Sequence, residues 1–279
     1  MAKPQQSYQN ETPTAEEKEQ NLRHLMREMQ RVLVAFSGGV DSSYLALVAT
    51  QEMGGNAFCV TGLSPSVSQM QREEAEKIAR AFNFNFQKIQ TDELEDPQYQ
   101  ANPINRCYHC KTELYGKLSS LATEKKIEFI LDGTNADDAR DYRPGRVAAQ
   151  EKNVRSPLIE VGLGKNEIRE LSKKQGLSTW DKPSSPCLSS RIAYGVPVTI
   201  ERLSKIERGE QILRTEGFRE FRVRVHEEIV RLEIAPGEMP RALNLNVTGK
   251  LADKFRALGF KYVTLDLHGY RSGAMNEVL

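Results

Sequence analysis

The amino-acid sequence predicts an α/β protein in which a doubly wound parallel sheet is followed by a smaller α+β domain. Before residue 190, short apolar and β-branched runs alternate with helical patterns, as buried parallel strands alternate with their crossover helices. After residue 191 the order changes to helix, hairpin, helix and strand. We therefore expect a disordered lead-in at 1–20, a larger domain at 21–190 and a smaller domain at 191–279.

The elements follow from changes in hydrophobic period along the chain. A helical spacing over 16–30 precedes a buried strand at 31–36, a glycine turn at 37–43 and a helix at 44–53. Further strands are predicted at 57–62, 86–89 and 127–132, an extended segment at 158–160, and helices at 67–82, 111–126 and 165–175. The smaller domain is predicted as a helix at 201–216, a hairpin of 221–226 and 229–234, a mostly helical stretch at 239–258 and a strand at 262–267.

Composition and charge are those of an ordinary soluble chain. Its 279 residues carry a formal net charge of +1, with 28% charged and 39% hydrophobic residues. This balance gives no global electrostatic reason to expect nucleic acid, and no apolar run approaches the roughly 20 residues that cross a membrane. The first residues lack the apolar core of a signal peptide. We expect a cytoplasmic protein without nucleic-acid or membrane partners, which forms homo-oligomers.

The strongest motif is the glycine turn at 37–43, which lies between a predicted strand and a predicted helix. Two glycines let the backbone approach a ligand, and the free N–H groups of the turn and of the helix start point at one spot. A carboxylate here can hold a Mg²⁺ ion that bridges phosphates. The alternative is a plain turn with a serine N-cap, and the lysine of a Walker A motif is absent. The expected nucleotide ligands are Ser37, Gly38, Gly39, Asp41, Ser42 and Ser43, with Asp41 also on Mg²⁺.

This turn resembles the SGGxDS loop of PP-loop ATP pyrophosphatases, which split ATP between its α- and β-phosphates. The resemblance implies a PP-loop domain that binds ATP and adenylates a carbonyl or carboxylate oxygen, after which a nucleophile displaces AMP. Amidating, tRNA-modifying and thiolating enzymes all fit that scheme. The sequence shows no glutaminase-like domain and no added basic module, and its cysteines favour thiolation.

Three of the four cysteines lie in surroundings that favour chemistry. Cys107 and Cys110 form a C-x-x-C pair at a predicted helix start with basic neighbours, which lower the pKa of thiols. Such a pair can chelate a metal, form a redox disulfide or be inert. Cys187 lies in a Pro/Ser-rich loop near Arg191, and a buried inert thiol is the alternative there. Cys59 lies in a predicted core strand and is expected to be only a small hydrophobic residue.

With these residues in place, the sequence resembles the pyridinium biscarboxylic acid mononucleotide sulfurtransferases, the LarE family of nickel-pincer nucleotide (lactate racemase cofactor) biosynthesis. The resemblance runs from about residue 22 through nearly the whole remaining chain. Besides the phosphate loop, the segments that carry it are 132–138, 141–145, 186–191, 222–224, 262–267 and 269–273. Each segment alone is a weak signal, and their combination is specific.

The resemblance implies that ATP activates a substrate carboxylate and that sulfur then replaces oxygen. In one kind of member the loop cysteine, here Cys187, gives up its own sulfur and becomes dehydroalanine. Another kind binds a [4Fe-4S] cluster through three cysteines, and an open iron receives sulfide or sulfur from another donor. This sequence departs from the first kind by having Cys107 and Cys110, and three thiolates suit such a cluster. We therefore expect all three cysteines to be catalytic cluster ligands.

The resemblance also places the mononucleotide substrate in the smaller domain. Arg222 and Arg224 alternate with valines and so project from one strand face, which is either a grip for phosphate or a solvated surface. The implied substrate ligands are Ser190, Arg191, Glu210, Arg222 and Arg224. Gly133 is expected beside ATP, and the neighbouring Asp132, Asp137 and Asp138 have no individual roles from the sequence. A tRNA thiolase and a non-catalytic nucleotide-binding protein remain the other candidate classes.

Overall fold

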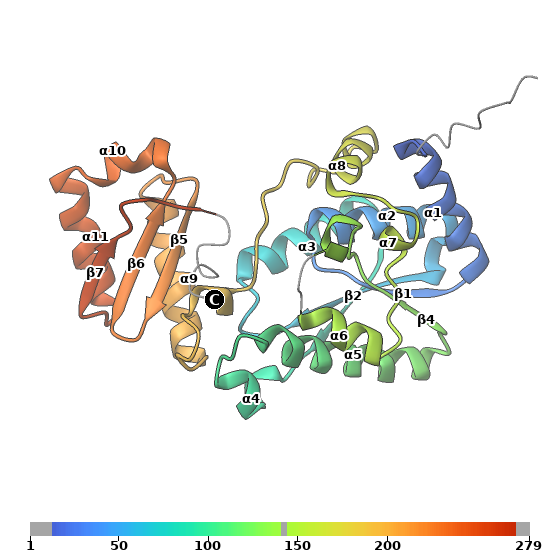
Figure 1. The fold of residues 1–279 in the computed structure, drawn as a ribbon, viewed down its shortest axis with the longest axis horizontal. Helices are drawn as coiled ribbons and strands as arrows, with labels where there is room; N and C mark the ends of the chain where they lie inside the picture. Colours follow the sequence, from blue (N-terminus) through green and yellow to red (C-terminus); the bar gives the residue numbers. More distant parts are fainter. Residues whose placement is uncertain (1–12, 141–143, 272–279) are drawn as a thin grey trace, which may run out of the picture.

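The computed structural model describes residues 13–140 and 144–271 and contains two sheets (Figure 1). The larger sheet has the strand order β3-β2-β1-β4, and all its neighbouring strands run parallel. Its strands are β1 (Val32–Ala35), β2 (Ala57–Leu63), β3 (Asn85–Gln90) and β4 (Phe129–Leu131). The predicted parallel α/β sheet is therefore confirmed. Most of the lead-in, the start of the segment 141–145 and the end of the segment 269–273 lie outside the described residues.

Helices cover both faces of the larger sheet, because side chains of the central strand β1 alternate between two apolar clusters. Val32 and Val34 pack into the cluster beneath α1, α2, α3 and α8, whereas Leu33 packs into the cluster beneath α5 and α6. These helices are α1 (Ala15–Met29), α2 (Val40–Met53), α3 (Gln69–Ala81), α5 (Arg106–Lys125), α6 (Pro144–Glu151) and α8 (Lys165–Lys174). The sheet is thus wound on both sides, as the sequence predicts.

The smaller sheet has the order β5-β6-β7 and lies beside the larger body in Figure 1. The predicted hairpin is confirmed, since β5 and β6 pair antiparallel, and β7 then joins β6 in parallel. Its elements are α9 (Ile200–Thr215), β5 (Phe221–His226), β6 (Ile229–Ile234), α10 (Met239–Ala242), α11 (Leu245–Ala257) and β7 (Tyr262–Leu265). A second apolar core forms between this sheet and its helices.

Some boundaries differ from the sequence prediction. The helix expected at 111–126 begins five residues earlier as α5, so that both cysteines of the C-x-x-C pair lie in its first two turns. The segment expected to be extended at 158–160 is the short helix α7 (Pro157–Glu160), because proline is well suited to the first turn of a helix. Elements that were not predicted are the helix α6 and the shorter α4 (Pro97–Gln100), η1 (Gly54–Asn56), η2 (Glu93–Glu95), η3 (Asp137–Arg140), η4 (Leu188–Arg191) and η5 (Pro236–Glu238).

Residues from before the predicted domain boundary contribute to the core of the smaller sheet. Tyr99 and Leu188, which precede the smaller sheet in the chain, pack into its apolar cluster. The domain division between residues 190 and 191 therefore stays a prediction from the sequence. Among the described helices, none has the length and apolar character needed to cross a membrane.

Candidate functional site

The phosphate loop, residues 37–43, comprises the turn that follows β1 and the first turn of α2. Gly38 has φ +71°, and a Cβ there would lie 3.0 Å from the Cα of Ala75 on α3. The hydroxyls of Ser37 and Ser42 lie 3.0 Å apart, and the N–H of Gly39 donates to the Ser37 hydroxyl at 3.4 Å. Left-handed backbone and close packing both require glycine at position 38, so this turn is built for close approach of the backbone.

The turn after β4 is pressed against this loop. A Cβ on Gly133 would lie 2.8 Å from the backbone nitrogen of Ser42, so residue 133 has to be glycine for the two segments to touch. Asp132, just before it, is 7% exposed. Its carboxylate accepts hydrogen bonds from the hydroxyls of Tyr115, Thr134 and Ser156 and from the N–H of Thr134. Asp132 therefore holds the turn in place, and Gly133 lies beside the phosphate loop. Its contact with ATP stays a prediction.

Asp41 is the acidic group of the loop, and it is held by a lysine. The Lys165 ammonium lies 2.9 and 2.7 Å from the two carboxylate oxygens of Asp41, and the amide of Asn135 donates at 3.4 Å. Asp137 accepts from the backbone N–H of Lys165 at 2.7 Å, and so fixes the start of α8 against this corner. Ser43 is fully buried, and its hydroxyl has no hydrogen-bond partner among the described residues.

The sequence analysis did not single out two lysines that the structure places at the phosphate loop. Lys165 pairs with Asp41, and the ammonium of Lys182 lies 3.4 Å from the carbonyl oxygen of Gly38 while pairing with Glu74. Both lysines lie more than a hundred residues beyond the loop in the chain, so no local motif could reveal them. The only available signal was that the predicted helix at 165–175 starts with lysine.

The three cysteines predicted to be catalytic, Cys107, Cys110 and Cys187, lie in one region of the structure. Cys107 and Cys110 lie in the first two turns of α5, and Cys187 comes immediately before the turn η4. Cys107 as a whole residue is exposed to solvent. The pKa of its thiol is nevertheless raised, first because protein atoms surround the thiol and second because of electrostatic repulsion by Cys187. Burial, Glu93 and Cys187 raise the pKa of Cys110. The lowered thiol pKa expected from the basic neighbours is therefore wrong for both residues, because burial outweighs the charges of Arg106 and Lys111. The three thiols therefore lie within electrostatic reach of one another.

A buried hydrogen-bond network explains how a loop some eighty residues further along the chain reaches the start of α5. The hydroxyl of Tyr99 lies 2.6 Å from that of Ser189, and the Arg106 guanidinium donates to the carbonyl of Ser189 at 2.8 Å. Asn102 donates its amide to the carbonyls of Ala193 and Val196 at 2.7 and 2.9 Å. Because buried polar groups need partners, these bonds fix the segment after Cys187 on the helix that carries the other two cysteines.

The predicted substrate arginines surround the same loop. Arg191 donates to the carbonyl of Cys187 at 2.8 Å, Arg222 to that of Ser184 at 3.1 Å and Arg224 to that of Ser190 at 3.0 Å. They therefore do not form a solvated strand face, since Arg224 is buried and Arg222 is half-buried. The sequence anticipated the gathering of these arginines but not their bonds to the loop backbone.

Positive charge is crowded at this point of the smaller sheet. Burial, and then the charge of Arg191, lower the pKa of Arg222, and burial likewise lowers the pKa of Arg224. Two glutamates offset part of the charge: Glu210 pairs with Arg191 at 2.9 Å and Glu233 pairs with Arg224 at 3.0 Å. Arg222 forms no ion pair among the described residues and stacks on the ring of Tyr270, 4.7 Å from its centroid. Arg222 is therefore the arginine best placed to accept an anionic ligand.

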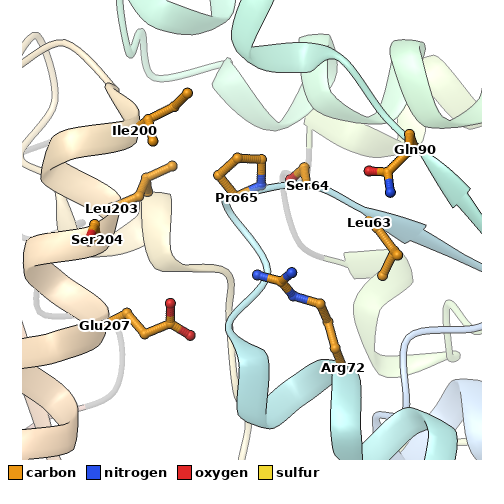
Figure 2. A pocket seen from close by; sticks show the side chains of 9 residues that line it. All are labelled: Leu63, Ser64, Pro65, Arg72, Gln90, Ile200, Leu203, Ser204 and Glu207. Atoms are coloured by element: carbon orange, nitrogen blue, oxygen red, sulfur yellow. The ribbon is translucent and has the colours of Figure 1, made fainter.

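A pocket of about 280 Å³ lies where α9 faces the end of β2 and the start of α3. Figure 2 shows Arg72 and Glu207 pointing into it from opposite sides. Its walls are formed by Leu63, Ser64, Pro65, Arg72, Gln90, Ile200, Leu203, Ser204 and Glu207. None of the predicted site residues lines this pocket, so it belongs to the junction of the two bodies and not to the chemistry described above.

Comparison with known proteins identifies the family, although no family model matches the chain. The chain is 34% identical to the pyridinium-3,5-bisthiocarboxylic acid mononucleotide synthase of Lactiplantibacillus plantarum, over 91% of this chain and 92% of that protein. The chain belongs to the LarE family. It is also 44% identical to an uncharacterised protein of Synechocystis sp. over 95% of this chain and 98% of that protein.

This LarE-family protein is also similar to part of a longer enzyme. The chain is 30% identical to the GMP synthase of Thermus thermophilus over 68% of this chain, which covers 42% of that longer protein. This agrees with the PP-loop resemblance of residues 37–43 and with the parallel sheet that carries them.

The resemblance implies two inorganic groups, Mg²⁺ and a [4Fe-4S] cluster, and the residues present fit Mg²⁺ better than they fit the cluster. Asp41, partly exposed at the loop, offers a carboxylate of the kind that Mg²⁺ binds. For a cluster, three thiols within electrostatic reach of one another, near the buried Arg106, have suitable chemistry, because a cation stabilises anionic sulfur. Within 13–140 and 144–271, however, no three His, Cys, Asp or Glu side chains stand close enough to hold one metal ion.

Proposed function

We propose that this LarE-family protein uses ATP to adenylate a carboxylate of pyridinium-3,5-biscarboxylic acid mononucleotide and then replaces oxygen by sulfur. The observation that carries this proposal is the position of the Cys187 loop. One side of the loop is tied to α3, beside the phosphate loop, since Gln71 donates to the carbonyl of Ser185 at 2.7 Å. Its other side is held by arginines of the smaller sheet, including Arg222. A sulfur atom at Cys187 would therefore lie between the nucleotide and the substrate.

The first chemical step follows from the phosphate loop. A carboxylate oxygen of the substrate attacks the α-phosphorus of ATP, the bond from that phosphorus to the bridging oxygen breaks, and pyrophosphate leaves. The N–H groups at the start of α2 would hold phosphate oxygens, and Asp41 would hold Mg²⁺, which offsets the negative charge of the leaving group. The product is an acyl-adenylate, whose carbonyl carbon is open to a sulfur nucleophile.

In the second step sulfur bonds to that carbonyl carbon, the bond to the AMP oxygen breaks, and a thiocarboxylate remains. We propose that Cys107, Cys110 and Cys187 hold a [4Fe-4S] cluster, which when bound supplies sulfide for this transfer. Arg106 would stabilise the anionic sulfur, and its bond to Ser189 keeps the Cys187 loop against α5. The rival is a sacrificial Cys187, favoured by the lack of a preformed three-ligand metal group in the described parts of the chain.

The partners of this reaction would be ATP with Mg²⁺, the mononucleotide substrate, and sulfide or another sulfur donor. We propose that the crowded arginines bind the phosphate of the mononucleotide, with Ser190 and Glu210 completing that site. Glu210 would act by orienting Arg191, with which it pairs. We also propose that the protein acts in the cytoplasm and assembles into homo-oligomers.

Replacing Arg222 with alanine should weaken binding of the mononucleotide by about ten- to a hundredfold, because one charge-assisted hydrogen bond to phosphate is lost. ATP affinity should stay unchanged, since Arg222 contacts the Cys187 loop and Tyr270 but not the phosphate loop. Isothermal calorimetry with each ligand measures both effects. The matched control is Arg219→Ala, an exposed arginine two residues before β5. Equal loss of ATP affinity, or no loss of mononucleotide affinity, would place Arg222 outside the substrate site.

A further inference from the structure

The pocket between α9 and the end of β2 contains two opposite charges that do not pair with each other (Figure 2). Arg72, in the first turn of α3, points into the pocket from one side, and Glu207 of α9 points into it from the other. Within 13–140 and 144–271, neither side chain forms an ion pair. A small ligand that carries both charges would complete this arrangement.

Each of the two charged groups is held by one hydrogen bond and keeps further atoms for a ligand. The Nε of Arg72 donates to the carbonyl of Val67 at 2.9 Å, whereas its terminal nitrogens have no partner among the described residues. One carboxylate oxygen of Glu207 accepts from the N–H of Gln69 at 2.6 Å, and the other has no partner in the same part of the chain. Because both groups are oriented before a ligand arrives, less side-chain entropy is lost on binding.

The rest of the pocket offers apolar surface. Ile200, Leu203 and Glu207 are spaced three and four residues apart, so they lie on one face of α9. Leu203 is buried, whereas Ile200 is 64% exposed and leaves its apolar surface open to a ligand. Leu63 and Pro65 add apolar surface from the end of β2 and the turn after it. An aliphatic group in this pocket would remove these surfaces from water.

We propose that this pocket binds a free α-amino acid with an aliphatic side chain. The carboxylate of the amino acid would pair with Arg72 and its ammonium with Glu207, while its side chain would lie against Ile200 and Leu203. A ligand with a single charge would leave the other charge of the pocket unpaired, so both charges of the ligand are needed. The site is independent of the proposed adenylation, because its walls contain no residue of the phosphate loop.

A ligand in this pocket would contact two parts of the molecule. Helix α9 packs on the smaller sheet, whereas Arg72 belongs to the first turn of α3 beside the larger sheet. The neighbouring Gln71 holds the Cys187 loop, because it donates to the carbonyl of Ser185 at 2.7 Å. A bound amino acid would therefore stabilise the same turn of α3 that holds this loop.

Ligand-observed NMR titrations with L-leucine test the proposal, together with two probes that each carry one of its charges. Isocaproate lacks the ammonium and isoamylamine lacks the carboxylate, so both should bind at least about tenfold more weakly than L-leucine. Arg72→Met and Glu207→Gln should each weaken L-leucine binding by about ten- to a hundredfold, and Arg72→Lys should keep part of the affinity because it keeps the charge. Arg80→Met and Glu201→Gln change exposed charges on the same two helices and should leave the affinity unchanged.

Three results would overturn this inference and leave the proposed adenylation untouched. The first is an unaltered protein that binds none of L-leucine, L-valine and L-alanine with a dissociation constant below about 1 mM. The second is equal affinity for L-leucine and for either single-charge probe, which would exclude a site built for two charges. The third is unchanged L-leucine affinity in Arg72→Met and Glu207→Gln, which would place the amino-acid site outside this pocket.

Discussion

Replacing Asp41 with alanine should lower the rate of pyrophosphate release by at least about a hundredfold, the usual cost of removing one preorganised electrostatic group. The carboxylate is the acidic group of the phosphate loop, and it is the group that we propose holds Mg²⁺ beside the phosphates. Lys165 loses its partner at the same time. A coupled assay that reports pyrophosphate, in the presence of the mononucleotide, measures this rate directly.

Two further variants test whether the effect comes from the negative charge of Asp41. Asp41→Asn preserves the size of the side chain and its hydrogen bonding but removes the charge, so it should be nearly as slow as the alanine variant. Asp253→Ala, at an exposed position of α11, should release pyrophosphate at the native rate. If Asp41→Ala kept the native rate, or if the native protein released ADP and phosphate, the assignment of residues 37–43 as an adenylation loop would be wrong.

Replacing Cys187 with alanine should abolish sulfur transfer and leave adenylation intact. Alanine keeps the backbone carbonyl to which Arg191 and Ser190 donate, so the loop should keep its shape. Substrate-dependent exchange of labelled pyrophosphate into ATP reports adenylation without needing sulfur, and mass spectrometry of the product reports sulfur transfer. Loss of both activities would mean that Cys187 supports the nucleotide site and is not the point of sulfur transfer.

The other cysteines separate the two possible sources of sulfur. If a cluster is held by three thiolates, Cys107→Ala and Cys110→Ala should lose both reconstituted iron and repeated turnover. If Cys187 is sacrificed, only Cys187 matters, and the native protein should react once and lose the mass of H₂S at that residue. Cys59→Ala is the control, because burial raises the pKa of Cys59 to about 12 and keeps this core thiol inert.

The fold was predictable because its main signals are local. Alternation of buried strands with helices reports a parallel sheet, and the two glycines of the phosphate loop report a backbone that side chains would obstruct. Gly38 explains why this motif predicts the turn: its φ of +71° and its contact with Ala75 both exclude other residues at position 38. The change in the order of predicted elements after residue 191 similarly indicates a second sheet. Its hairpin lies where apolar and polar residues alternate in the sequence.

The rest of the site depends on contacts between distant segments, which leave no spacing in the chain. Lys165 meets Asp41 across more than a hundred residues, and Asn102 holds carbonyls some ninety residues further on. A buried polar residue such as Asn102 looks like any loop asparagine until its partners are known. The arginines show a subtler limit. The alternation with valines shows that Arg222 and Arg224 share one strand face. It does not show that both arginines bind the backbone of the Cys187 loop.

In the proposed order of steps, the substrate carboxylate attacks ATP before sulfur enters. This order can be tested by labelling the carboxylate oxygens of the mononucleotide with ¹⁸O and analysing the AMP that forms. Because an acyl-adenylate leaves its bridging oxygen on AMP when sulfur displaces it, we expect one ¹⁸O atom in the phosphate of each AMP. AMP without the label, formed while the mononucleotide gains sulfur, would contradict carboxylate adenylation.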